Sequence, residues 1–193
     1  MDLTAFFKRE FAEHHEVARQ TESLAADFAD VVGACAQSIR GGGKILLFGN
    51  GGSAADAQHL ATELTVRYKK DRAPIAAIAL TTDTSALTAA GNDLGFEYVF
   101  ARQIEALGRA GDIAVAISTS GQSPNILAGL KQARVQKLVT VAFTGMRGSG
   151  LKETADHVLI VPSETTARIQ EMHILLGQML CGALEIELGL ANP

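Results

Sequence analysis

The side chains best suited to chemistry in this sequence lie within residues 49–63. His59 and Glu63 are four residues apart, so a helix would bring both side chains to one face. An imidazole beside a carboxylate can hold a metal ion or transfer a proton. A glycine-rich turn from Gly49 to Ser53 comes shortly before this pair. The stretch therefore combines a turn that can approach a ligand with a metal or acid–base pair.

The turn is typical of a strand that leads into a helix. The apolar run Leu46–Phe48 precedes it, and small helix-forming residues follow it. Free backbone N–H groups and the helix dipole at such a junction bind anions such as phosphate. Asn50, Gly51 and Gly52 form the turn itself, and Ser53 is expected to cap the helix with its hydroxyl.

Two other interpretations of the turn are open. The spacing Gly49-x-Gly51-x-x-Ala54 also satisfies the loose dinucleotide-binding fingerprint, which expects an acidic residue at the end of the second strand. Asp83 lies near that place, but it follows two threonines and is better suited to capping a helix. A glycine-rich turn without any ligand is the other interpretation.

A second polar loop follows the third predicted strand. It carries four hydroxyl side chains, a glycine, and a proline suited to the start of a helix: Ser118, Thr119, Ser120, Gly121, Ser123 and Pro124. Hydroxyls at a helix N-terminus bind phosphate without a lysine, unlike a Walker-type nucleotide loop. An ordinary hydroxyl-capped turn is the alternative. Because one sheet would bring both loops to the same edge, a shared phosphate site is the stronger hypothesis.

Composition narrows the class of protein. The 193 residues suit a single domain, 1–193, with a sizeable core. Seventeen Lys and Arg against 21 Asp and Glu give a formal net charge of −4, so nothing indicates a nucleic-acid partner. No apolar run approaches the roughly 20 residues of a membrane span, and the N-terminus lacks the layout of a signal peptide. We therefore expect a cytoplasmic protein without a membrane partner.

The order of apolar and helical patterns predicts an α/β fold. Residues 1–40 contain two helical patterns, residues 44–162 alternate apolar runs with helices, and residues 165–188 form one long helix. Such alternation is the signature of parallel βαβ units, and apolar runs without polar alternation indicate a sheet buried on both faces. The five strand candidates are Ile45–Phe48, Ala76–Leu80, Ile113–Ile117, Val139–Phe143 and Val158–Val161.

The C-terminal helix mixes apolar and polar positions. Gln170, His173 and Gln178 interrupt an apolar stripe, so each either hydrogen-bonds within an interface or faces a ligand. This helix and the N-terminal helices carry more apolar surface than one domain of this size readily covers. We therefore expect a subunit contact that includes Met172 and Leu176.

Other titratable residues have ordinary explanations. Cys35 and Cys181 have no partner at metal-ligand spacing, so buried free thiols are expected. His14 and His15 lie among charged residues, which indicates a solvated helix face.

Five short motifs follow one another along the chain: Gly49-Asn50-Gly51-Gly52-Ser53, Ala57-Gln58-His59, Gly91-Asn92-Asp93, Ser118-Thr119-Ser120-Gly121 and Arg168-Ile169-Gln170-Glu171. Together they resemble the sugar isomerase (SIS) domain family, most closely its sedoheptulose 7-phosphate isomerase branch. The resemblance implies a three-layer α-β-α fold with a five-stranded parallel flavodoxin-like sheet, and a homotetramer with active sites between subunits. It also implies zinc in many members, and isomerisation to D-glycero-D-manno-heptose 7-phosphate through an enediol. That reaction belongs to the cytoplasmic synthesis of ADP-heptose for bacterial surface polysaccharide.

The resemblance further implies roles for individual residues. Substrate contacts fall on Asn50, Gly51, Gly52, Ser53, Asn92, Asp93, Ser118, Thr119, Ser120, Ser123 and Gln170. Metal ligands fall on His59, Glu63, Gln170 and Gln178, and Glu63 is also the catalytic carboxylate. In this motif Asn92 and Asp93, which follow Gly91, are expected to form a turn.

Gln178 departs from the family pattern, which has a histidine there as a metal ligand and second acid–base group. A glutamine offers a carbonyl oxygen to a metal but exchanges no proton near neutral pH, so a weakened zinc site is expected. His173 is the nearest candidate for the second catalytic group. It lies about 140° away around the helix, so it could act only from a neighbouring subunit or after a local distortion.

The same departure supports a non-catalytic alternative. A replication-initiator-binding relative shares the fold and the Arg168 to Glu171 motif but lacks the glutamate matched by Glu63. Such a protein would bind a phosphosugar or a protein partner without chemistry. The presence of Glu63 and of Gly91-Asn92-Asp93 favours the isomerase.

Overall fold

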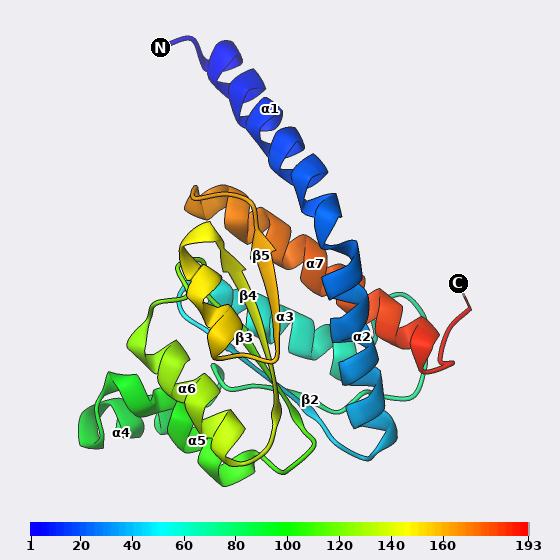
Figure 1. The fold of residues 1–193 in the computed structure, drawn as a ribbon, viewed down its shortest axis with the longest axis vertical. Coiled ribbons are helices and arrows are strands. Elements are labelled where there is room, and N and C mark those ends of the chain that lie inside the picture. The colour runs from blue at the N-terminus through cyan, green and yellow to red at the C-terminus, as the bar shows by residue number, and fades with distance from the viewer. Residues whose placement is uncertain (193) are drawn as a thin grey trace.

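The computed structural model describes residues 1–192, and Figure 1 shows the order of their helices and strands. The α-helices are α1 (Leu3–Thr21), α2 (Ala25–Arg40), α3 (Gly52–Thr65), α4 (Thr84–Asp93), α5 (Val99–Leu107), α6 (Pro124–Val135) and α7 (Thr166–Glu187). The strands are β1 (Ile45–Gly49), β2 (Ala77–Ala79), β3 (Ile113–Ile117), β4 (Val139–Gly145) and β5 (His157–Val161). Short 3-10 helices are η1 (Glu22–Leu24), η2 (Phe96–Tyr98) and η3 (Met146–Glu153).

The strands form one parallel sheet in the order β2-β1-β3-β4-β5. This is the flavodoxin-like order, so the predicted α/β fold with a five-stranded parallel sheet is confirmed. The predicted strands differ from the observed ones only at their ends. For example, β4 continues to Gly145 rather than ending at Phe143.

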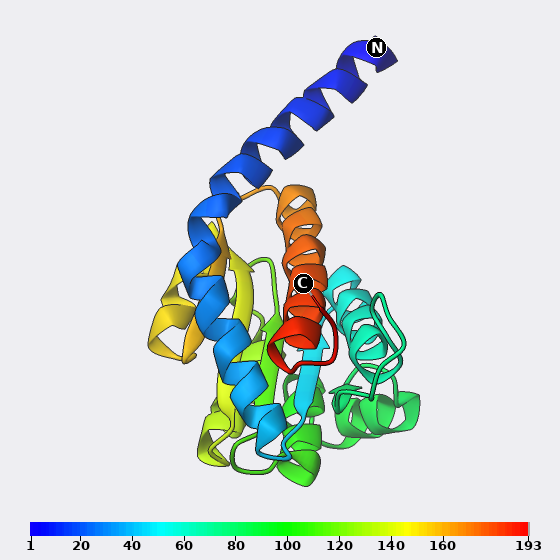
Figure 2. The same cartoon turned by 90° about the vertical axis from the view of Figure 1, so that its right-hand side faces the viewer.

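Alternate side chains of the central strands enter two hydrophobic cores. On β1, Ile45 and Leu47 pack into the core shared with α2, α3 and α7, whereas Leu46 and Phe48 pack into the core beside α5 and α6. Helices α2, α3 and α7 therefore cover one face of the sheet and α4 to α6 lie on the other (Figures 1 and 2). Burial on both faces explains why these strands are continuously apolar.

The strand order reverses between β1 and β3. Gly49, the last residue of β1, is paired with Ile117, the last residue of β3. The loops that follow these two strands therefore start side by side at the carboxyl edge of the sheet. In open α/β sheets, ligands bind in the crevice at this reversal point.

Helix α1 extends away from the body of the molecule (Figure 2). The Asp2 side chain caps it by accepting hydrogen bonds from two backbone N–H groups of the first turn. Large apolar side chains along its outer part are 41 to 67 % exposed: Leu3, Phe6, Phe7 and Phe11. An isolated monomer would thus leave an apolar helix surface in water.

Charged side chains hold the inner part of α1 against α7. Arg168 donates to the main-chain carbonyl oxygen of Glu10 at 2.8 Å and pairs with the Glu171 carboxylate at 2.5 Å. His14 Nδ1 lies 2.8 Å from Glu171 Oε2, and its side chain is 38 % exposed, so the predicted solvated face also makes a contact with α7. His15 is exposed, as predicted.

Helix α7 packs its apolar stripe into the core of its own chain. Met172 and Leu176 are 1 % and 4 % exposed, so the expectation that they form a subunit contact is wrong. The apolar side chains that α7 does expose are Leu175, Met179 and Ile186.

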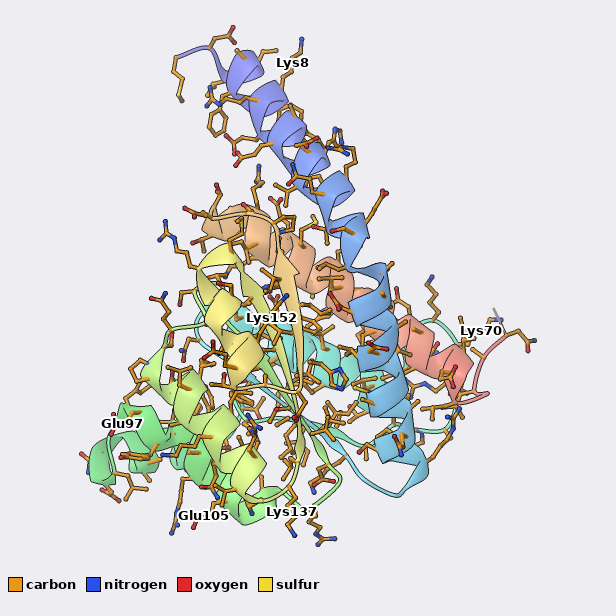
Figure 3. All side chains as sticks on the ribbon, in the orientation of Figure 1. Lys8, Lys70, Glu97, Glu105, Lys137 and Lys152 are labelled. Atoms are coloured by element: carbon orange, nitrogen blue, oxygen red, sulfur yellow. The ribbon has the colours of Figure 1, made fainter. Side chains whose placement is uncertain are left out.

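The two thiols and the surface of the molecule complete the description of the fold. Cys35 and Cys181 are free and buried, as predicted, and burial raises the pKa of both thiols to about 12. None of the helices within residues 1–192 has the length and apolarity that crossing a membrane requires. Charged side chains such as Lys70, Glu105 and Lys137 point outward from the body (Figure 3).

Candidate active site

The first loop, residues 50–53, joins β1 to α3 through a turn that only glycine fits. A Cβ on Gly49 would lie 2.8 Å from the Ile117 carbonyl oxygen and 2.8 Å from the Ser53 Cβ. Gly51 precedes α3 with a φ of +56° and no side chain caps the helix. The prediction that Ser53 caps α3 is therefore wrong. Ser53 is instead the second residue of the helix and is 3 % exposed.

The second loop, residues 118–123, joins β3 to α6. The buried Ser118 Oγ accepts a hydrogen bond from the Gly121 N–H at 3.1 Å, and Gly121 has a φ of +63°. Ser123 occupies the cap position of α6 without capping it through its side chain, and Pro124 is the first helical residue, as predicted. The Ser123 hydroxyl and the start of α6 are thus available to an anion.

Two asparagines connect the two loops. Asn50 Nδ2 donates to Asn125 Oδ1 at 2.9 Å, and Asn125 Nδ2 donates to Asn50 Oδ1 at 2.8 Å. Both residues line a hollow of about 540 Å³ together with Ser123 and residues 95–97. Sequence reasoning missed Asn125, since its partner lies 75 residues away.

The predicted metal or acid–base pair forms on α3. His59 Nε2 lies 3.2 Å from Glu63 Oε1, and the two side chains are 49 % and 22 % exposed. The Gln178 amide of α7 contacts His59 Nε2 from the neighbouring helix. Burial raises the pKa of Asp56, one turn earlier, and the nearby His59 opposes part of that shift. The structure thus brings His59, Glu63 and Gln178 together at a surface that a ligand can reach.

Gln170 lies nearer to the start of α3. A Cβ on Gly52 would lie 2.5 Å from Gln170 Nε2, so the amide rests directly against the first loop. The helical rise of 1.5 Å per residue puts Gly52 roughly 10 Å from His59 along α3. Gln170 therefore faces the start of α3, beside the predicted anion loop. Gln178 faces the later turns of α3, which carry the predicted acid–base pair.

His173 lies apart from this group. It is 0 % exposed, its ring centroid is 6.1 Å from that of Phe143, and neither ring nitrogen has a hydrogen-bond partner within residues 1–192. Burial lowers its pKa to about 4, and the nearby Thr144 backbone opposes part of the shift. A neutral imidazole in the core does not reach a substrate at the two loops.

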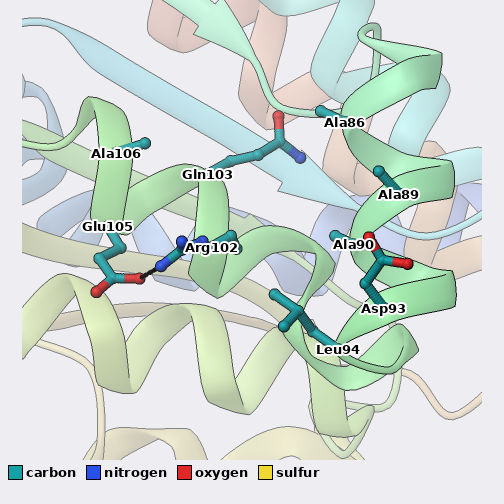
Figure 4. A pocket seen from close by; sticks show the side chains of 9 residues that line it. All are labelled: Ala86, Ala89, Ala90, Asp93, Leu94, Arg102, Gln103, Glu105 and Ala106. Carbon is teal, nitrogen blue, oxygen red and sulfur yellow. Dashed lines mark hydrogen bonds and ion pairs between the residues drawn. The ribbon is translucent and has the colours of Figure 1, made fainter.

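Asn92 and Asp93 lie at the C-terminal end of α4, so the expected turn at Gly91-Asn92-Asp93 is wrong. Asn92 Nδ2 donates to Asp93 Oδ1 at 2.7 Å. Asp93 lines a hollow of about 700 Å³ between α4 and α5, across from Arg102 and Glu105, which pair with each other (Figure 4). Residues of α4, α5 and Leu94 line this hollow, which makes it separate from the one beside the two loops.

The side chains of His59, Glu63 and Gln178 are the candidate metal ligands of this site. Within residues 1–192, no group of three or more His, Cys, Asp or Glu side chains is arranged to hold a metal ion. His59, Glu63 and Gln178 do converge, and a half-turn of the Gln178 amide presents its oxygen to the other two. One imidazole nitrogen, one carboxylate oxygen and one amide oxygen fit a divalent cation. The amide makes this a weaker zinc set than a second imidazole would.

Two polar loops that each lead into a helix at the reversal point of a parallel sheet are the arrangement with which α/β proteins bind phosphate. Residues 9–145 match the SIS domain family. The chain belongs to this family.

The chain is also similar to individual members. It is 54 % identical over 186 residues to a phosphoheptose isomerase from Paramagnetospirillum magneticum, covering 96 % of this chain and 97 % of that protein. It is 53 % identical over 179 residues to a phosphoheptose isomerase from Aquifex aeolicus, covering 92 % and 94 %. A solved phosphoheptose isomerase from Neisseria gonorrhoeae matches with a TM-score of 0.89 and 44 % identity, covering 95 % of this chain and 98 % of that one.

Proposed function

We propose that the chain is a phosphoheptose isomerase that converts D-sedoheptulose 7-phosphate into D-glycero-D-manno-heptose 7-phosphate. The position of Glu63 carries the proposal. Its carboxylate is accessible, and it lies on the helix whose first residues belong to the anion-binding loop. One helix can thus contact a phosphosugar at its N-terminal end and present a base further along. Phosphoheptose isomerases that match nearly the whole chain at about half of its positions give independent support.

Glu63 is the base that moves a proton between C1 and C2 of the sugar. It removes a proton from C1 of the ketose while the carbonyl oxygen on C2 takes a proton from water, which gives the enediol. Glu63 then returns its proton to C2 while the hydroxyl on C1 loses its proton to water, which gives the aldose. His59 Nε2 lies 3.2 Å from Glu63 Oε1 and orients the carboxylate. His173 takes no part in this mechanism because it is fully buried.

The two loops hold the rest of the substrate. Thr119, Ser120 and Ser123 are partly exposed, so their hydroxyls bind the phosphate beside the start of α6. Asn50 and Gln170 contact the sugar from the first loop and from α7. A substrate fixed at its phosphate end presents C1 and C2 to Glu63 in a defined geometry.

A divalent cation, zinc by family resemblance, would be held by His59, Glu63 and Gln178, with Gln170 on the same side of α7. When bound, it would polarise the substrate carbonyl oxygen. Glu63 itself transfers the proton.

We also propose a homotetramer that works in the cytoplasm and supplies heptose for ADP-heptose and surface polysaccharide. The exposed phenylalanines of α1, Phe6, Phe7 and Phe11, support assembly, because such surface is usually covered by another subunit.

The test is turnover of authentic sedoheptulose 7-phosphate by purified protein. Glu63→Gln keeps the shape of the side chain and removes the base, so kcat should fall by about a thousandfold. Glu105→Gln, which alters an exposed glutamate on α5, should leave kcat unchanged. No turnover by the wild-type protein, or equal turnover by Glu63→Gln, would contradict the proposal.

A further inference from the structure

Arg72 lies in the segment between α3 and β2 and is almost completely buried, with a side chain 1 % exposed. Its guanidinium donates to the carbonyl oxygens of Glu63 at 2.7 Å, Leu64 at 2.7 Å and Ala73 at 3.1 Å. Its Nε donates to Glu185 Oε1 at 2.9 Å. Every face of this buried cation therefore meets an oxygen, as a buried charge requires.

The first two of these oxygens belong to the last turn of α3. The final carbonyl groups of a helix have no partner within the helix, and the helix dipole places partial negative charge on them. A guanidinium can bond two such carbonyls at once because its donors form a planar fork. Arg72 thus closes the C-terminal end of α3 at Glu63, whose side chain is the proposed base.

The fourth partner belongs to α7. Glu185 Oε1 accepts from both Arg72 Nε and the Tyr68 N–H at 3.1 Å, so the segment after α3 is tied to the C-terminal part of α7 (Figure 1). Two turns earlier, α7 carries Gln178, which contacts His59 of α3. The Arg72–Glu185 pair therefore fixes the spacing of the two helices whose side chains form the proposed site.

We infer that Arg72, held by Glu185, is a positioning residue that sets the Glu63 carboxylate for proton transfer. This inference rests on the proposed function, with Glu63 as the base. Arg72 is buried behind the helix end, and it acts through the main chain of Glu63 rather than on the substrate.

A double variant separates positioning from stability. Arg72→Met together with Glu185→Met removes both charges and fills similar volume, and such apolar replacement of a buried pair is often neutral for stability. We expect a folded protein with a melting temperature near that of the wild type. Its kcat should fall about 100-fold, the effect of misplacing a catalytic group by about an ångström. KM should change little, because neither phosphate loop is altered.

Lys44→Met is the matched control. Lys44 and Asp112 form another largely buried ion pair, 2.5 Å apart, directly before β1 and β3, with no contact to α3 or α7 among its hydrogen bonds. Loss of this pair should lower the melting temperature without lowering kcat. Such a result would show that the kcat effect belongs to the end of α3 rather than to buried ion pairs in general.

If the double variant does not fold, Arg72→Lys tests the positioning role of Arg72 instead. Lysine keeps the charge but lacks the fork that reaches two carbonyls and Glu185 together, so kcat should fall about tenfold with KM unchanged. The inference would be overturned by a folded double variant whose kcat is within about threefold of wild type. If the double variant does not fold, the same result for a folded Arg72→Lys protein would overturn it. Glu63→Gln keeps the two questions separate. An active Glu63→Gln protein refutes the proposed base, whereas an inactive one beside an active Arg72 variant refutes only the positioning role.

Discussion

The two ends of α3 are completed in opposite ways. At the N-terminal end, Gly51 stands in the cap position and no side chain bonds the first turn. At the C-terminal end, the buried Arg72 bonds the carbonyls of Glu63 and Leu64. A buried cation thus completes the C-terminal end of α3. The N-terminal end has no side-chain cap, and the Ser53 and Ala54 N–H groups donate only to the carbonyl oxygens of Asn50 and Gly51 in the turn.

Helix α4 shows that the open end of α3 is a local feature. Asp83 caps α4, and its carboxylate accepts from the Ala86 N–H at 2.9 Å, as the sequence predicts. The same sheet therefore supports a helix with an ordinary cap after β2 and a helix without one after β1. On the proposed function, the uncapped start of α3 lies beside the phosphosugar, whereas the capped start of α4 does not.

Gly49→Ala should cause the largest loss at the open end. The new methyl group would lie 2.8 Å from the Ile117 carbonyl oxygen and from the Ser53 backbone, and neither can move without shifting β3 or α3. We expect kcat/KM to fall about 100-fold and stability to fall by about 3 kcal/mol. Steady-state kinetics and urea unfolding measure the two effects.

Gly33→Ala is the control for that substitution. Gly33 lies in α2, and no atom is within 4 Å of the position its Cβ would take. Alanine there should stabilise the protein by up to about 1 kcal/mol with no change in kinetics. Normal activity in Gly49→Ala would mean that the turn does not need its close approach to β3.

The fold was largely predictable because its signals are local. Continuous apolar runs follow from burial on both faces of the sheet, and glycine or hydroxyl clusters mark where β1 and β3 end. Each signal lies within a few residues of the element it describes. The same holds for the Asp83 cap and for the spacing of His59 and Glu63 on one helix.

The part of the site that sequence did not predict depends on long-range contacts. Asn125 bonds Asn50, and Arg72 bonds Glu185 across 113 residues of chain. No local pattern distinguishes these residues from ordinary surface amides and charges. Met172 was assigned to the wrong environment for a related reason, because an apolar stripe fits a chain's own core as well as a subunit contact.

Gln178→His tests the site midway along α3, between its two ends. An imidazole in place of the amide adds a second nitrogen donor facing His59, so zinc affinity should rise by at least about tenfold. Competition with a chromogenic chelator measures this independently of turnover. Gln136→His, on the far layer of the molecule, should leave zinc affinity as it is. Equal affinity in the Gln178→His and wild-type proteins would show that the amide is already a full ligand, or that no metal binds here.

Asp83→Ala should have the smallest effect and sharpens the contrast between α3 and α4. Loss of the bond to the Ala86 N–H leaves the first turn of α4 without its cap, which should lower stability by about 1 kcal/mol. KM for the phosphosugar should stay the same, because on the proposed function the start of α4 binds no ligand. Asp83 already pairs the backbone there. Asp83→Asn is the matched variant, since asparagine also caps helices and should restore most of the stability. A rise in KM with either substitution would mean that α4, like α3, presents its N-terminal end to the substrate.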